Sequence, residues 1–144
     1  MTGQVDQFGM YVAGRLAHWG REFALHRDCE YLGHQSKNMV QVLIEHKGEM
    51  PARPTGFKPL EVDMLAQQVE DIIADMARVD RTLATVMRAY YCGKGRKFHE
   101  RLDTCNEMLV GMGLPKTHRN AYNVMHQRGF DWVRGVMLGM ARAA

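Results

Sequence analysis

The sequence predicts an all-α protein, a helical domain with a C-terminal helix-turn-helix. Apolar residues recur three and four positions apart along most of the chain, which is the period of an amphipathic helix. No segment shows sustained alternation of apolar and polar residues or an Asn-Gly or Asp-Gly hairpin turn. The chain has 144 residues, of which 46% are hydrophobic, so it has the size and composition of one ordinary folded domain.

Two helices are predicted before a proline-rich connection. The first covers residues 5–25, and its apolar face contains Phe8, Val12, Leu16, Trp19 and Phe23. The second covers residues 36–45, with Ser36 as its N-cap. Residues 48–59 hold three of the four prolines, which exclude a continuous helix. This segment is either a plain surface loop or a connection with a further role.

A long helix is predicted after this segment, with Pro59 in its first turn. Its apolar positions form a heptad-like seam of Leu65, Val69, Ile72, Met76, Val79 and Leu83. The seam fits packing within a monomer or a dimeric coiled coil. The outward face is predicted to carry Glu61, Asp63, Glu70, Asp71 and Asp75. Asp80 is predicted to cap a new helix.

Residues 85–136 show the order of elements that defines a helix-turn-helix. A helix that ends near residues 89–91 is followed by a turn at residues 93–95. The next helix has an apolar face of Phe98, Leu102, Cys105, Met108 and Leu109. Residues 110–115 contain two glycines and a proline that stop it, and a third helix begins near residues 116–117.

Charge separates the two parts of the chain. Residues 1–87 carry nine lysines and arginines against twelve acidic residues, and residues 88–144 carry ten against four. The formal charges are therefore −3 and +6, which suggests a polyanionic partner for the basic part. We accordingly divide the chain into an N-terminal region, residues 1–84, and a basic region, residues 85–144, within one compact unit.

The basic region contains the candidate DNA-binding residues. In a helix-turn-helix the second helix enters the major groove by its N-terminal end. That end would present Lys116, Thr117, His118, Arg119, Asn120, Asn123 and Gln127. Arginine suits guanine, and asparagine or glutamine suits adenine. Arg96, Lys97 and Arg101 are placed to meet phosphates. The alternative is a polar, solvated face on a helical hairpin.

Four segments resemble the phage late-gene antitermination protein Q family. They are YLGHQSKNM at 31–39, EHKGEMPARPTGFKPL at 45–60, RAYY at 88–91 and WVRG at 132–135. The C-terminal half is also similar to the fourth region of sigma factors. The resemblance implies a protein that binds double-stranded DNA near a late promoter, engages bacterial RNA polymerase and its sigma factor, and permits terminator read-through. If so, Arg53, Phe57 and Lys58 in the stiff proline-rich segment are candidate polymerase contacts.

Other function classes lack support in the sequence. No signal peptide or apolar run of about 20 residues is present, so we expect a cytoplasmic protein. The resemblance implies that this is the host bacterial cytoplasm. Cys29, Cys92 and Cys105 form no CxxC, so we expect reduced thiols, at least one in the core, and no metal or other cofactor. No phosphate loop or nucleophile motif suggests an enzyme. A helix-turn-helix repressor or activator, a protein-binding helical adaptor and a homodimer remain alternatives.

Overall fold

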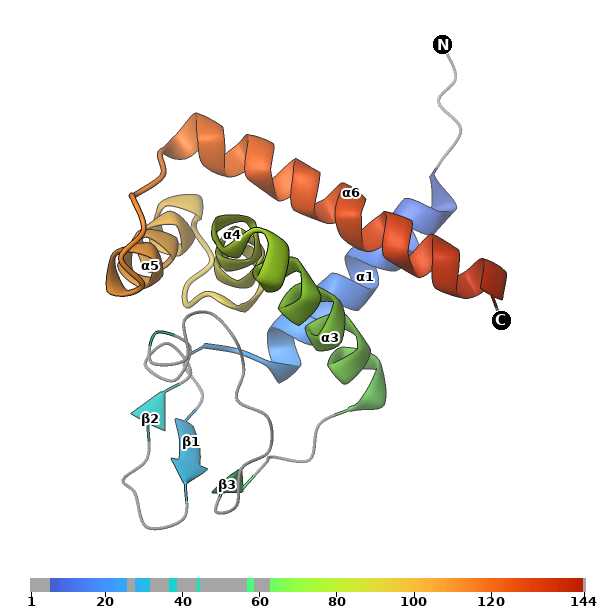
Figure 1. Ribbon diagram of the computed structural model, residues 1–144, viewed down its shortest axis with the longest axis horizontal. Helices are drawn as coiled ribbons and strands as arrows, with labels where there is room; N and C mark the ends of the chain where they lie inside the picture. The colour runs from blue at the N-terminus through green and yellow to red at the C-terminus, as the bar shows by residue number, and fades with distance from the viewer. Residues whose placement is uncertain are drawn as a thin grey trace.

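The computed structural model describes residues 6–25, 28–31, 37–38, 44, 57–58 and 63–143. Its elements are α1 (Gln7–Glu22), β1 (Asp28–Tyr31), β2 (Lys37–Asn38), β3 (Phe57–Lys58), α3 (Met64–Val79), α4 (Arg81–Cys92), α5 (Phe98–Gly111) and α6 (Arg119–Ala143). The helices form the body of the molecule, and α6 runs across the others (Figure 1). The all-α fold class is therefore confirmed.

Helix α1 lies where the sequence places it and is shorter at both ends. Asp6 caps it, because its side chain accepts a hydrogen bond of 2.9 Å from the N–H of Gly9. Its apolar face is buried at Val12, Leu16 and Trp19. Phe23, just beyond the last turn, is also buried and packs in the same core.

A small antiparallel sheet, in the order β2-β1-β3, lies between α1 and α3 in the chain and was not predicted. Lys37 and Asn38 pair with β1, so the helix expected over residues 36–45 does not begin there. Ile44 is helical, and the rest of that range and Ser36 lie outside the described residues. Phe57 and Lys58 pair with β1 from its other edge, inside the segment expected to be irregular. Strands of two to four residues are too short to show a period of two in the sequence.

Helix α3 begins at Met64, so Pro59 is not in its first turn. Asp63 is the cap, and its side chain accepts a hydrogen bond of 2.7 Å from the N–H of Leu65. Asp80 caps α4 as predicted, through a bond of 3.0 Å from the N–H of Leu83. The seam is buried at its centre, but Leu65 and Val79 are 53% and 75% exposed.

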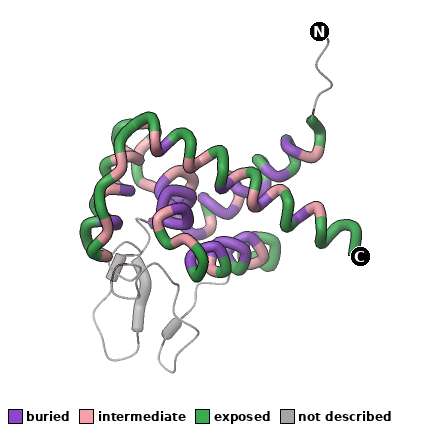
Figure 2. Tube along the Cα trace, turned by 45° about the horizontal axis from the view of Figure 1, so that its top comes forward, coloured by how far each residue is buried: buried purple, intermediate pink, exposed green. Residues whose placement is uncertain are grey.

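Helix α4 is the centre of the core. Every residue from Leu83 to Ala89 is buried, and α4 contacts α1, α3, α5 and α6 (Figure 2). At Gly20 a Cβ atom would overlap the carbonyl oxygen of Tyr91, so α1 and α4 approach each other closely. The boundary placed between residues 84 and 85 lies inside this helix, which packs against helices of both regions.

The core contains an ion pair that was not predicted from the sequence. Glu70, expected on an exposed face, is only 3% exposed. Its carboxylate accepts two hydrogen bonds, of 2.7 and 2.5 Å, from the guanidinium of the equally buried Arg88. The indole N–H of Trp19 donates a third, of 3.1 Å. One polar cluster therefore joins α1, α3 and α4, and each partner compensates the burial of the other.

Two of the three cysteines are buried free thiols, as expected for core residues. These are Cys92 and Cys105. Burial raises the pKa of the Cys105 thiol to about 12, and burial also raises the pKa of Cys92. Both thiols are thus held protonated and shielded from reaction at neutral pH.

Candidate nucleic-acid interface

The connection between α5 and α6 brings the N-terminal ends of these two helices together. Residues 112–118 form it, which makes it longer than the three or four residues of a helix-turn-helix turn. It runs back along α5, because the N–H of Thr117 donates a hydrogen bond of 2.8 Å to Asn106 Oδ1. Gly113 adopts a φ of 79°, a conformation that favours glycine. The first turn of α6 therefore lies beside α5 rather than beyond its C-terminal end.

Phe98 joins the first turns of α5 and α6. Its ring meets that of Tyr122 edge to face, with centroids 5.3 Å apart. The guanidinium carbon of Arg119 lies 5.3 Å from the centre of the same ring. This cation–π contact holds Arg119, a predicted base-reading residue, at the junction of the two helices.

Four of the ten candidate residues lie in the two connections beside this junction, two before α5 and two between α5 and α6. Arg96 and Lys97 are exposed directly before α5. Lys97 is the N-cap residue and makes no capping bond with its side chain, so the first N–H groups of α5 have no side-chain cap. Lys116 is exposed, whereas Thr117 is half-buried and its hydroxyl oxygen has no hydrogen-bond partner.

Five further candidates lie at the start of α6 or on its outward side. His118, Arg119, Asn120, Asn123 and Gln127 are all exposed. The opposite side of the helix is anchored by Tyr122 and Gly129, which are buried. We call the exposed set Arg96, Lys97, Lys116, His118, Arg119, Asn120, Asn123 and Gln127 the basic end.

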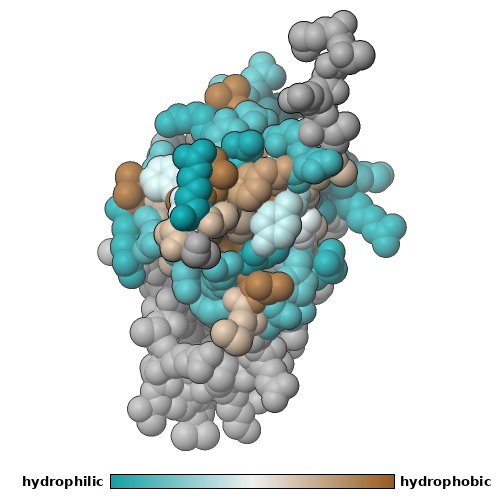
Figure 3. Space-filling model, turned by 90° about the vertical axis from the view of Figure 1, so that its right-hand side faces the viewer, coloured by the Kyte–Doolittle hydropathy of each residue, from teal (hydrophilic) through white to brown (hydrophobic). Residues whose placement is uncertain are grey.

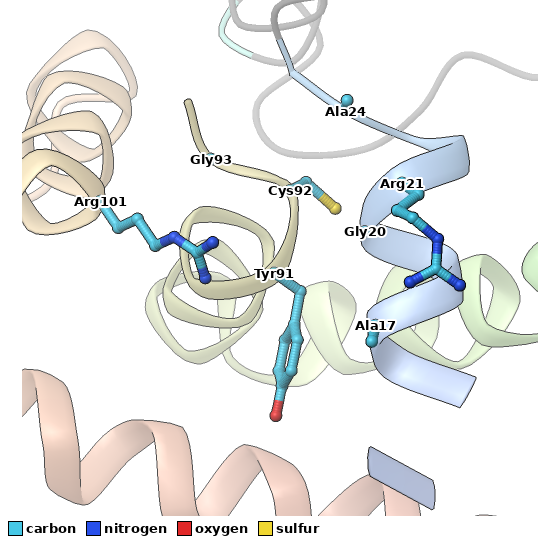
Figure 4. Close-up of a pocket in the computed structure, with 8 residues that line it drawn as sticks. All are labelled: Ala17, Gly20, Arg21, Ala24, Tyr91, Cys92, Gly93 and Arg101. Carbon is cyan, nitrogen blue, oxygen red and sulfur yellow. The ribbon is translucent and has the colours of Figure 1, made fainter. Parts of the chain in front are cut away.

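Arg101 has a structural role that its position in the sequence did not indicate. Its Nε donates a hydrogen bond of 3.2 Å to the carbonyl oxygen of Gly95, and its Nη1 donates to that of Tyr90. Figure 4 shows its guanidinium reaching toward the end of α4, at a cleft of about 510 Å³ that Arg21 and Cys92 also line. Arg101 therefore holds the connection between α4 and α5, with only part of its guanidinium left for a phosphate.

Acidic residues mark how far the basic end extends along α5 and α6. Asp103 and Glu107 are exposed on α5 beyond its first turn. On α6, Asp131 Oδ1 accepts a hydrogen bond of 3.1 Å from Gln127 Nε2. The carboxylate orients the amide of Gln127 and also ends the stretch of α6 that suits a polyanion.

An aromatic cluster fixes α6 on α4. The rings of Tyr90 and His126 are stacked, with centroids 3.6 Å apart and planes 14° from parallel. Tyr91 and His126 share a hydrogen bond of 2.7 Å between the hydroxyl and Nε2. Burial lowers the pKa of His126, so its ring is neutral at physiological pH. The sequence reasoning missed this contact, because Tyr90 and His126 are far apart in the chain.

The candidate polymerase contacts are placed only in part. Phe57 and Lys58 lie in β3, opposite Tyr31 and Glu30 of β1. Arg53 lies outside the described residues. Among the residues that the structure describes, no group of three or more His, Cys, Asp or Glu side chains is arranged to hold a metal ion.

Comparison with known proteins gives no relative for this fold. No protein-family model matches the chain, no curated protein is significantly similar to it, and no solved structure matches its fold. Within the described part of the chain, no helix has both the length and the apolar character that a membrane span requires.

Proposed function

We propose that this protein is a DNA-binding regulator of phage late transcription, of the antitermination protein Q kind. In this proposal the basic end binds duplex DNA, and another surface engages RNA polymerase so that it reads through terminators. The observation that carries the proposal is the exposure of one face of α6, rich in amides, beside arginines and lysines from two helix starts.

The basic end suits the major groove in size and chemistry. The groove admits one α-helix, and one face of α6 is open to solvent along its first three turns. Asn120, Asn123 and Gln127 would pair with adenine, and Arg119 with guanine. Arg96 and Lys97, at the adjoining start of α5, would bind phosphates and fix the register of α6. The arrangement serves the purpose of a helix-turn-helix with a longer connection.

The antitermination role rests on the resemblance of residues 31–39, 45–60, 88–91 and 132–135 to the Q family. In this role the protein would act in the host bacterial cytoplasm as a binding protein without catalytic activity. Arg53, Phe57 and Lys58 remain its proposed polymerase contacts, and the sigma factor is the second proposed partner. A homodimer remains an alternative to a monomer, so the test includes the oligomeric state.

Gel shifts and transcription assays test the proposal in sequence. Duplexes that tile the genomic region around the protein's own gene should include one that binds in preference to random DNA. Lys116→Ala with Arg119→Ala should abolish this preference, whereas Arg142→Ala, an exposed arginine at the far end of α6, should not. Transcription from the bound promoter through a terminator should then show increased read-through.

Each alternative predicts a different result. A repressor or activator binds the same duplex and changes initiation without changing read-through. A protein-binding adaptor binds no duplex in preference to random DNA. Either result would replace the proposed function with that alternative.

A further inference from the structure

An apolar groove lies at the end of α6 opposite the basic end. Phe8 and Tyr11 of α1 and Met137 and Met140 of α6 line it, and its volume is about 220 Å³. Tyr11 is 52% exposed and Met140 is 38% exposed. Figure 3 shows apolar side chains gathered in the middle of this face and hydrophilic ones around them. A cluster of this kind on a folded surface is characteristic of a binding site.

The groove also contains a buried positive charge that has no counter-ion among the residues that the structure describes. Arg15 lines it and is only 9% exposed. Its guanidinium donates to three neutral acceptors: the hydroxyl of Tyr11 at 2.7 Å, the carbonyl oxygen of Leu65 at 3.0 Å and Oε1 of Gln68 at 2.6 Å. Its Nε–H has no partner.

Arg88, in contrast, is a buried arginine that has a counter-ion. It is 1% exposed and is neutralised by the two carboxylate oxygens of Glu70. Burial of a charge is costly unless the charge is paired. The Nε–H of each arginine is buried without a hydrogen-bond partner, so the two differ in the carboxylate: Glu70 neutralises Arg88, and no described residue neutralises Arg15.

We propose that this groove binds an amphipathic helix of a partner protein that carries an aspartate or glutamate within its apolar face. The carboxylate pairs with Arg15, and the flanking apolar side chains lie on Phe8, Tyr11, Met137 and Met140. Methionine side chains adapt their shape to an incoming apolar surface, as in other proteins that bind helices in grooves.

A helix fits the groove better than a second copy of the chain does. The exposed apolar side chains of the groove cover on the order of a few hundred Å². A stable dimer buries about 800 Å² on each partner. The positive charge further selects an acidic segment over a neutral or basic one.

The groove is independent of the proposed DNA contacts. Asn120 and Met140 are separated by ~30 Å along α6, at 1.5 Å per residue. DNA and the partner helix can therefore be bound at the same time. The inference goes beyond the proposed function and stands or falls separately from DNA binding.

A peptide selection tests the inference. The probe is a library of helical peptides with a fixed leucine stripe and randomised positions inside and beside it, selected on the full-length protein. Enriched peptides should carry Asp or Glu inside the stripe. Exchange of this acid for its amide should weaken binding about tenfold or more, the effect of losing one charge-assisted hydrogen bond.

Variants locate the site. Met140→Asp should abolish binding of the selected peptide, whereas Val110→Asp, at a more exposed position on α5, should bind it as the wild type does. Arg15→Gln should bind the acidic and amide peptides alike. If Arg15→Gln does not fold, the side-chain Nε–H resonance of wild-type Arg15 replaces it, and this resonance should shift with the acidic peptide and not with the amide one.

Several outcomes overturn the inference. These are the absence of enriched peptides, enrichment of neutral or basic stripes, and binding that survives Met140→Asp. Sedimentation of the wild type as a dimer that Met140→Asp dissociates would assign the groove to a second copy of the chain. If the wild-type protein binds the selected peptide but no DNA, the proposed function is refuted and this inference stands.

Discussion

Lys97 and Arg101 lie four residues apart at the start of α5, yet the structure predicts different consequences when each is replaced by alanine. Lys97 is exposed and makes no capping bond with its side chain. Its loss should lower the magnitude of the slope of log K against log salt by about 0.9, the contribution of one phosphate contact. Over a fourfold change in salt, this slope corresponds to a difference of about threefold in affinity. Stability should change by less than about 0.5 kcal/mol, as for other surface substitutions.

Arg101→Ala should instead destabilise the fold. The substitution removes the hydrogen bonds to the carbonyl oxygens of Tyr90 and Gly95, which hold the end of α4 to the start of α5. A hydrogen bond from a charged donor contributes about 1.5–3 kcal/mol, and less where solvent reaches it. Because Arg101 is half-buried, we expect a total loss of about 1–3 kcal/mol. Affinity for all DNA sequences should fall as the start of α5 loses its support.

Two measurements on each variant separate these effects. Fluorescence anisotropy with labelled duplex over a salt series gives the slope, and urea denaturation gives the free energy of unfolding. Arg142→Ala is the charge-matched control, and it should change neither quantity appreciably. An unchanged slope in Lys97→Ala would show that phosphates are not bound at this end. A wild-type urea midpoint in Arg101→Ala would show that its two hydrogen bonds contribute no stability.

Three further predictions follow from the contacts of the core and of α6. Asn123→Ala should cost about 1–3 kcal/mol of binding to the preferred duplex and leave random DNA unaffected. A competition gel shift measures this, and an equal loss on both would argue against base reading. Glu70→Gln should lower the free energy of unfolding by about 3–5 kcal/mol, because it leaves Arg88 buried and unpaired. Glu70→Leu with Arg88→Met should lose less than Glu70→Gln alone in urea denaturation, and an additive loss would contradict the ion-pair argument. Finally, burial lowers the pKa of His126 in the native state, so the unfolded chain binds the proton first as the pH falls. Stability should therefore decrease as the pH falls through about 6.5, the ordinary pKa of histidine. Urea midpoints at pH 7.5 and 5.5 should differ less in His126→Gln than in the wild type, and an equal difference would show that His126 is not responsible.

Local sequence signals predicted the helices with strong apolar faces. Asp80 was identified as a cap because an aspartate at a helix start bonds to the free N–H groups of the first turn. The apolar face of α5 was also correct, since Cys105, Met108 and Leu109 are buried. Residues 110–115 ended α5 as expected, at Gly111.

Features that depend on distant partners were not predictable in the same way. The strands β2 and β3 exist through pairing with β1, and neither has enough residues to show a period. Arg101 donates to backbone carbonyl oxygens, which every residue has, so the sequence gives no sign of this contact. The burial of Glu70 could have been inferred from the sequence, because Glu70 continues the buried face formed by Ala66, Ile73 and Ala77. A charged residue in such a face indicates a buried partner, which proved to be Arg88.

The position of α6 would allow one helix to serve the two proposed partners. Its middle is fixed on α4, where a Cβ at Gly129 would overlap the side chain of the buried Met87 and where His126 stacks on Tyr90. Interiors are packed too densely for such a contact to slide, so the helix is held at this point. The basic end extends from it in one direction, and Met140 with the apolar groove lies in the other. A rigid helix transmits orientation along its length. DNA bound at Asn123 would therefore set the direction in which the groove presents a partner helix, without any conformational change in the protein.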